Sequence, residues 1–148
     1  MEKFEQRNPI PTVDIIIEYG DGKKKGIVLI TRKNPPYGLA LPGGFAELGL
    51  SYEDNARNEA KEETNLDVII ANPGHPYTYS EPDRDPRGHF ATNVFYARGS
   101  GVLKAGDDAK TTMLCTIDEV IEMLGKSKFA FDHEKIVADY LKNKGYLA

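Results

Sequence analysis

The fold and the function of this protein are both indicated by residues 41–66, which read LPGGFAELGLSYEDNARNEAKEETNL. The segment starts with a Pro42-Gly43-Gly44 turn and leads into a helix predicted over residues 51–65. Ser51 is a suitable N-cap, and Asn65 can adopt the left-handed conformation that ends a helix. The apolar stripe of this helix is narrow and built on alanines, which predicts that the helix packs closely against a neighbouring layer.

One face of the predicted helix is acidic. Glu59, Glu62 and Glu63 lie within about 100° of one another on a helical wheel. An acidic face of this kind is either simply solvated or a site for Mg²⁺ or Mn²⁺, which favour carboxylate oxygens together with water and phosphate. The glycines of the preceding turn favour the second interpretation, because they let the backbone come close to a ligand. The predicted chemistry is therefore metal-assisted hydrolysis of a phosphate compound.

Outward from this segment, β-branched and apolar runs alternate with turn residues. We expect strands at residues 13–19, 26–32, 39–41, 68–71, 77–80, 89–98 and 113–117, and further helices at 118–124 and 133–144, the last one capped by Asp132. The first two strands are joined by Gly20-Asp21-Gly22, which predicts an antiparallel pair. The alternation predicts a layered α/β or α+β domain.

Size and composition exclude several classes of protein. The 148 residues fit one domain spanning 1–148, and 40% hydrophobic with 28% charged residues is typical of a globular chain. A net charge of −4 gives no support for nucleic-acid binding. The single cysteine, Cys115, cannot form an internal disulfide, and no apolar run has the length of a signal peptide or membrane span. We expect a soluble cytoplasmic protein with no membrane partner.

The segment also resembles the Nudix box of the Nudix hydrolase family, whose pattern is G-x5-E-x7-R-E-U-x-E-E-x-G-U with U a bulky aliphatic residue. The residues in register are Gly44, Glu59, Glu62, Glu63 and Leu66. Three positions depart from the pattern: Leu50 replaces a Glu, Asn58 replaces an Arg and Asn65 replaces a Gly. Asn is tolerated in a left-handed cap, so the third departure is mild.

The other two departures bear on activity. In the family, the Arg and the first Glu help to orient the metal-binding carboxylates, as outer groups do at metal sites. Because Leu50 and Asn58 replace both partners, no charge is left stranded. The resemblance therefore implies that metal binding is retained and that the rate is reduced; an inactive binding protein is the alternative.

Four further segments resemble the ADP-ribose pyrophosphatase branch of this family. They are residues 32–38 (RKNPPYG), 83–89 (DRDPRGH), 105–110 (AGDDAK) and 130–136 (AFDHEKI), and Pro82 stands sixteen residues after Leu66, as is common in that branch. The resemblance implies a Nudix-type α/β/α sandwich with a central mixed sheet. It implies hydrolysis of ADP-ribose, a small-molecule nucleotide, to AMP and ribose 5-phosphate with Mg²⁺, or with Mn²⁺ instead. It also implies a homodimer.

The resemblance assigns roles to particular residues. Glu59, Glu62 and Glu63 would hold the ions and serve catalysis, and the Gly44 carbonyl would be a further ligand. The general base would be Glu59, Glu63 or an acid of the Asp107-Asp108 loop. The expected substrate-binding residues are Arg32, Tyr37, Phe45, Pro82, Arg84, Arg87 and Asp108.

Alternatives stand beside several of these roles. Arg84 and Arg87 either bind phosphate or pair with the aspartates next to them, and Tyr37 and Phe45 either stack on adenine or pack. His133 we assign to structure. For the whole chain, the rival functions are hydrolysis of another nucleotide, a non-catalytic ADP-ribose sensor, and a globular domain whose acidic helix has no ligand.

Overall fold

The computed structural model of the chain describes residues 7–106 and 109–148. The strands are β1 (Ile10–Gly20), β2 (Lys25–Arg32), β3 (Leu39–Ala40), β4 (Gly43–Phe45), β5 (Asp67–Ile70), β6 (Tyr77–Tyr79), β7 (Phe90–Ser100) and β8 (Ala109–Cys115). The helices are α1 (Tyr52–Thr64), α2 (Ile117–Met123) and α3 (His133–Asn143). No helix in these ranges has the length and apolar character needed to cross a bilayer.

The centre of the fold is one mixed sheet. Its main strand order is β3-β2-β1-β7-β5, with β4 added to β1, β6 to β7 and β8 to β2. The long strands β1 and β7 run parallel, in register from Ile10 opposite Phe90 to Glu18 opposite Arg98. Both faces of β1 are covered, which explains why residues 13–17 are all buried and read as an almost unbroken apolar run.

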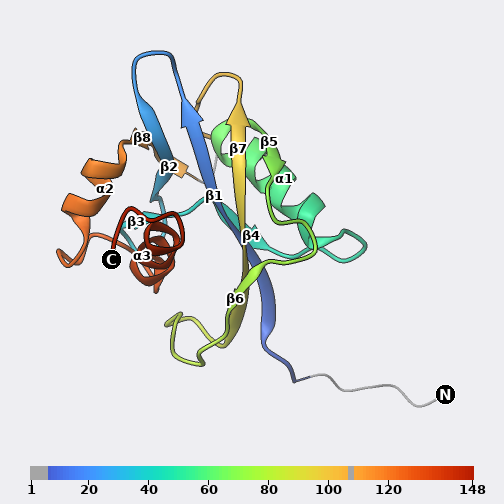
Figure 1. Ribbon diagram of the computed structural model, residues 1–148. Coiled ribbons are helices and arrows are strands. Elements are labelled where there is room, and N and C mark those ends of the chain that lie inside the picture. The colour runs from blue at the N-terminus through green and yellow to red at the C-terminus, as the bar shows by residue number, and fades with distance from the viewer. Residues whose placement is uncertain (1–6, 107–108) are drawn as a thin grey trace.

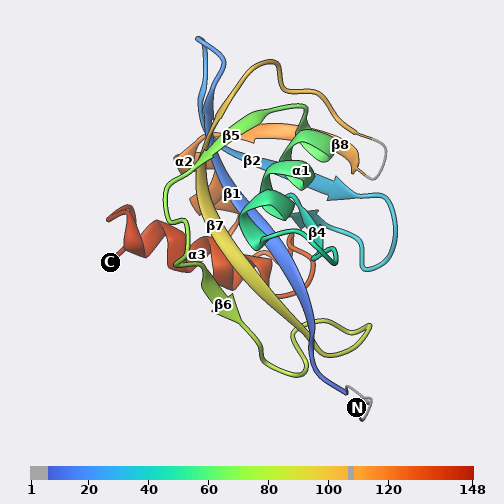
Figure 2. The ribbon, with the colours of Figure 1, turned by 90° about the vertical axis from the view of Figure 1, so that its right-hand side faces the viewer.

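Helices cover both faces of this sheet (Figures 1 and 2). On one face, α1 packs through Ala56 and Ala60, both fully buried, against a core that includes Ile15 and Phe95. On the other face, α2 and α3 cover a second core that includes Leu29 and Tyr140. The expected α/β/α sandwich with a central mixed sheet is confirmed.

The first helix forms as its sequence predicts. The Ser51 hydroxyl accepts a hydrogen bond of 3.0 Å from the Asp54 amide, and Asn65 has a φ of 66° in the left-handed region. The expected ends of the other elements are within a few residues of those found.

Two local expectations are wrong. The sequence predicted a turn at Pro42-Gly43-Gly44, but Gly43 and Gly44 belong to β4, which pairs with β1. Asp132 precedes α3 but makes no side-chain capping bond. Its carboxylate is bound by Arg84 instead, because a charge-assisted pair is stronger than a cap on a helix end.

The sheet opens between β1 and β2. These strands pair only where residues 18–20 face residues 25–27. Farther along, β1 pairs with β4 through residues 12–14, and β2 pairs with β3 through residues 30–31. The chain between β3 and β4 therefore lies in the gap between two diverging strands, and this gap positions the site described below.

We expect Gly26→Ala to destabilise the fold strongly, because a Cβ at Gly26 would lie 1.8 Å from the backbone oxygen of Cys115. Overpacking against backbone of this kind should lower the free energy of unfolding by about 3 kcal/mol. The matched control is Gly20→Ala, whose Cβ would meet its nearest atom at 3.6 Å and should cost less than about 1 kcal/mol. Urea denaturation of both variants measures the difference, and equal midpoints would contradict the close approach of β2 and β8.

Candidate functional site

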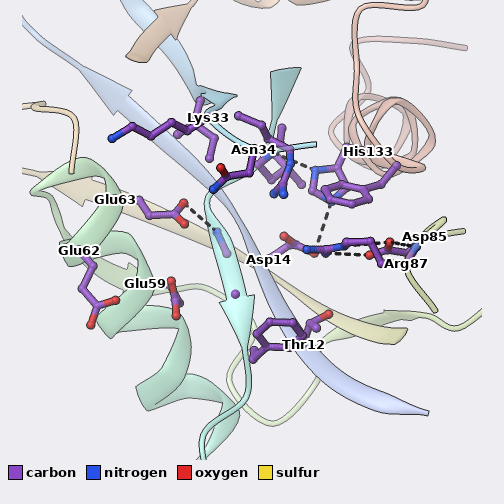
Figure 3. Close-up of a pocket in the computed structure, with 18 of the residues that line it drawn as sticks. Thr12, Asp14, Lys33, Asn34, Glu59, Glu62, Glu63, Asp85, Arg87 and His133 are labelled. Carbon is purple, nitrogen blue, oxygen red and sulfur yellow. Dashed lines mark hydrogen bonds and ion pairs between the residues drawn. The ribbon is translucent and has the colours of Figure 1, made fainter. Parts of the chain in front are cut away.

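A cavity of about 490 Å³ opens where β1 and β2 diverge. Its floor is made by Asp14 of β1, Ile30 of β2 and the Leu41 to Gly44 segment between them. Figure 3 shows its two sides. Glu59, Glu62 and Glu63 extend from α1 on one side, and Asp85, Arg87 and His133 lie on the other.

The acidic side of the cavity is packed against the glycine segment. Glu63 is 7% exposed, and its Oε2 accepts a hydrogen bond of 3.2 Å from the Gly43 amide. A Cβ at Gly44 would lie 2.6 Å from Oε1 of Glu59. Only a glycine at position 44 leaves the Glu59 carboxylate where it is. The structure thus brings Gly44 and the three glutamates into one cavity.

The C-terminal end of α1, which carries these glutamates, is held by hydrogen bonds from the segment that follows β7. The Lys104 amide donates to the Thr64 carbonyl at 2.9 Å, and the Gly106 amide donates to the Glu63 carbonyl at 3.1 Å. These bonds satisfy carbonyls that a helix end otherwise leaves without partners. The approach is so close that a Cβ at Gly106 would lie 1.7 Å from the Glu62 carbonyl oxygen.

The acidic side suits a divalent cation that is shared with a ligand. Within the part of the chain that the structure describes, no three acidic, histidine or cysteine side chains converge as a ready-made metal cage. Mg²⁺ and Mn²⁺ do not need one, because they bind through one or two carboxylates, water and substrate phosphate. The three glutamate carboxylates on one side of the cavity, with the backbone of Gly43 and Gly44 beside them, are oxygen donors of the type that this coordination uses.

The floor of the cavity holds a buried polar network. Asp14 Oδ2 accepts a hydrogen bond of 2.5 Å from the Thr92 hydroxyl and lies 3.6 Å from His133 Nε2. His133 Nδ1 accepts a hydrogen bond of 3.0 Å from the Leu41 amide, so the neutral ring carries its proton on Nε2, facing Asp14. His133 therefore has the expected structural role and also lines the cavity.

Two arginines of the opposite side are bound by aspartates. Arg84, buried, donates to both oxygens of Asp132 at 2.9 and 2.6 Å. Arg87 donates to both oxygens of Asp85 at 3.1 and 2.9 Å. Burial acts to raise the pKa of Asp85, but its hydrogen bonds from Arg87 outweigh burial and lower that pKa below the usual value. Arg87 thus pairs with a nearby aspartate, whereas Arg84 pairs with one far away in sequence.

Only some of the other substrate-binding residues predicted from the sequence line the cavity. Arg32 and Phe45 line the cavity, and Phe45 is 51% exposed with its ring 5.6 Å from that of Phe90. Tyr37 is 69% exposed and lines a separate shallow depression beside β2 and β8. Pro82 is exposed and is not part of the cavity lining. Asp107 and Asp108 lie outside the described residues.

Sequence reasoning did not nominate several residues that line the cavity or support its lining. Asp14 and Phe131 line the cavity, as does Glu47. Asn55, 2% exposed, holds the loop of Glu47: its side chain accepts from the Glu47 amide at 2.9 Å and donates to the Ser51 carbonyl at 2.8 Å. Asp14 alone gave a signal, as a charged residue inside the apolar run VDIII.

The two departures from the family pattern, Leu50 and Asn58, lie outside the cavity lining. Leu50 is 37% exposed, and Asn58 is exposed as well. Charged residues at these positions would therefore meet solvent rather than a packed core.

We expect Gly44→Ala to weaken metal binding with little effect on folding. The added Cβ would displace the end of the Glu59 side chain, which is flexible, and not backbone. Mn²⁺ affinity, measured by electron paramagnetic resonance, should fall about tenfold or more, as when a supporting group is lost at a metal site. The melting temperature without metal should stay close to that of the wild type. Unchanged Mn²⁺ affinity would contradict a metal role for Glu59.

Comparison with known proteins agrees with this geometry. The NUDIX domain family matches residues 8–140. An ADP-ribose pyrophosphatase of Methanocaldococcus jannaschii is 45% identical over 140 residues, which cover 93% of this chain and 76% of that protein.

Among solved structures, a MutT/nudix family protein from Enterococcus faecalis is 32% identical, with a TM-score of 0.74 over 93% of this chain and 62% of that one. A bifunctional NMN adenylyltransferase/ADP ribose pyrophosphatase from Francisella tularensis, complexed with AMP and a Mn ion, has a TM-score of 0.78 at 22% identity. The match covers 95% of this chain but only 43% of the bifunctional protein. The family match over residues 8–140 agrees with the fold and with the cavity that Gly44 and the three glutamates line. The chain belongs to the Nudix family.

Proposed function

We propose that the protein hydrolyses the pyrophosphate bond of ADP-ribose to AMP and ribose 5-phosphate, with Mg²⁺ or Mn²⁺ as cofactor. The observation that carries the proposal is one cavity lined by the three glutamates on one side and by Arg87 on the other. The 45% identical relative, an ADP-ribose pyrophosphatase, supports this substrate. The bound Mn ion in the Francisella protein supports a divalent metal.

The reaction is the attack of water on one phosphorus. The water oxygen forms a bond to phosphorus, the bridging P–O bond breaks, and the leaving phosphate monoester keeps the electron pair. A divalent cation bound here would polarise the phosphate and lower the pKa of the attacking water. A carboxylate accepts the water proton, and we assign this role to Glu59 or Glu63.

The three glutamates would share the work of holding the cation. Glu62 is exposed to the cavity side of α1, and Glu59 lies against Gly44, whose carbonyl is the proposed further ligand. Glu63 also accepts a hydrogen bond from the Gly43 amide at Oε2, so it ties β4 to α1. Groups that are already in position before the substrate binds lower the activation free energy of the hydrolysis.

The nucleotide would occupy the rest of the cavity. The half-exposed face of Phe45, supported by Phe90, offers a surface for adenine to stack on. Arg32, Arg84 and Arg87 supply positive charge in the same cavity, and Arg87 lies on the side opposite the glutamates. We further propose that the chain acts as one domain in the cytoplasm and forms a homodimer.

Glu62→Gln tests the metal site. The amide keeps the shape of the side chain but loses the negative charge that a cation needs. We expect turnover of ADP-ribose to fall on the order of 100-fold or more and the melting temperature to stay the same. The control is Glu122→Gln on α2, an exposed glutamate outside the cavity, which should not change the rate. An unchanged rate in Glu62→Gln would refute the metal-site assignment.

The paired departures from the box give a second test. Leu50→Glu and Asn58→Arg together should raise activity more than the sum of the two single effects, because each new charge is the other's partner. A complete double-mutant cycle on kcat/KM measures the coupling. Strictly additive effects would show that the two positions do not act as a unit.

A non-catalytic sensor is the rival that Leu50 and Asn58 favour. The deciding experiment is incubation of the protein with ADP-ribose and Mg²⁺, followed by separation of the products. Formation of AMP and ribose 5-phosphate supports the hydrolase. If calorimetry shows tight binding of ADP-ribose and the ligand stays intact, the sensor is supported. If a panel of nucleotides shows turnover of a different compound and none of ADP-ribose, that compound replaces ADP-ribose as the proposed substrate.

A further inference from the structure

His133 holds the backbone amide of Leu41, which lies three residues before Gly44, the proposed backbone ligand of the cation. The Nδ1 of the ring accepts a hydrogen bond of 3.0 Å from that amide. Leu41 is 2% exposed and His133 is 3% exposed, so water does not replace either partner. A buried N–H group that loses its acceptor is costly, and the backbone moves to find another. The position of the Leu41 amide therefore depends on an acceptor at this point of the ring.

The segment that leads to the cation ligand lies along the start of α3. The Leu39 amide donates to the Lys128 carbonyl at 2.9 Å, and the Ala130 amide donates back to the Leu39 carbonyl at 2.8 Å. The bond from the Leu41 amide to His133 continues this series. Of the three bonds, it is the one nearest in sequence to the glycines of β4. His133 is thus the last attachment of the segment to α3 before the cavity.

Two residues farther on, Gly43 is enclosed from both sides. A Cβ at Gly43 would lie 2.3 Å from Oδ1 of Asp14, and the Gly43 amide donates to Oε2 of Glu63 at 3.2 Å. Figure 3 shows Asp14 and His133 on one side of this segment and Glu63 on the other. A shift of the segment would press Gly43 against Asp14 or break its bond to Glu63. Movement at Leu41 is therefore passed on to a glutamate of the cavity.

Asp14 and Thr92 determine which ring nitrogen of His133 is the acceptor. Oδ2 of Asp14 lies 3.6 Å from Nε2 of His133 and accepts a hydrogen bond of 2.5 Å from the Thr92 hydroxyl. An ionised carboxylate can only accept, so it favours the tautomer that carries its proton on Nε2. Nδ1 is then left without a proton and can accept from the Leu41 amide. Side chains of β1, β7 and α3 thus define one acceptor.

We propose that His133 is a positioning residue for the cation site. By holding the Leu41 amide, it sets where the Gly44 carbonyl stands beside the carboxylates of Glu59 and Glu63. It acts through the backbone, not by contact with the cation. The proposal rests on the proposed function for the identity of the site as one for Mg²⁺ or Mn²⁺. It connects α3, on one face of the sheet, with the glutamates of α1 on the other face.

Two variants separate the two ring nitrogens. In His133→Asn, the side-chain oxygen can stand where Nδ1 stands and accept from the Leu41 amide. In His133→Gln, the longer side chain places its amide near the position of Nε2, where it can donate to Asp14, and Leu41 loses its acceptor. Mn²⁺ affinity, measured by electron paramagnetic resonance, should stay within about threefold of the wild type in His133→Asn and fall about tenfold or more in His133→Gln. Equal affinities in the two variants would overturn the proposal.

The effect of lost stability alone is measured with Tyr140→Phe. Tyr140 lies farther along α3, outside the cavity lining, and its hydroxyl donates to Glu18 at 2.8 Å. Loss of this bond should lower the melting temperature in EDTA and leave the Mn²⁺ affinity unchanged. If His133 is only a packing residue, His133→Gln will behave in the same way, with a lower melting temperature and the Mn²⁺ affinity of the wild type. That result would also overturn the proposal.

A measurement on the wild type does not depend on how the variants fold. In ¹⁵N-labelled protein, a scalar coupling across the hydrogen bond should connect the Leu41 amide nitrogen with Nδ1 of His133, and the ring shifts should place the proton on Nε2. Both signals should persist when Mg²⁺ is added, because the bond holds the segment in its cation-binding position. Absence of the coupling, or its loss on addition of Mg²⁺, would contradict the positioning role.

Failure of the proposed function can be told apart from failure of this inference. If ADP-ribose with Mg²⁺ gives no AMP while Mn²⁺ affinity still differs between His133→Asn and His133→Gln, the substrate assignment is wrong and the positioning role stands. If ADP-ribose is hydrolysed and the two variants bind Mn²⁺ equally well, the function stands and the positioning role is wrong.

Discussion

The site depends on the separation of β1 from β2 partway along their length. These strands pair at one end only, and beyond that β1 takes β4 and β2 takes β3 as partner. A fully paired sheet would leave no room between them, because neighbouring strands lie about 4.8 Å apart. The gap admits the Leu41 to Gly44 segment, and the buried Asp14 and His133 secure it through the Leu41 amide. The cavity and the position of the segment between β3 and β4 both follow from this one change of strand partners.

The three glutamates of the cavity lie on one side of it, and Arg87 lies on the other. Carboxylates stand on α1, and cationic side chains stand on the elements that face it. Side chains of opposite charge that face each other across a cavity would normally form ion pairs and fill it. Here each side is restrained locally: Glu63 is held by the Gly43 amide, and Arg84 and Arg87 are held by their own aspartates. The site therefore stays open for a ligand that carries both a cation and phosphate charge.

The sequence predicted the parts of the molecule that follow from local rules. Helix α1, with its Ser51 cap and left-handed Asn65, came from capping chemistry, and the long strands came from apolar runs. The resemblance supplied the sandwich and the acidic wall. What remained hidden were contacts between distant segments: the Arg84–Asp132 pair, the register bulge at Arg32 and the packing of Gly106 on the end of α1. The short strand β4 was missed because two glycines carry no strand propensity, and its pairing with β1 decides its form.

The parallel pairing of β1 with β7 has a consequence for how the protein is made. Residues 10–18 find their partners only at residues 90–98, across more than half of the chain. Contacts of such long sequence separation form slowly, and during synthesis on the ribosome the partner strand emerges late. The segment that carries the box glutamates is complete well before then. For that interval β1 has an unpaired edge, so the nascent chain is open to aggregation or to chaperone binding until β7 has been translated.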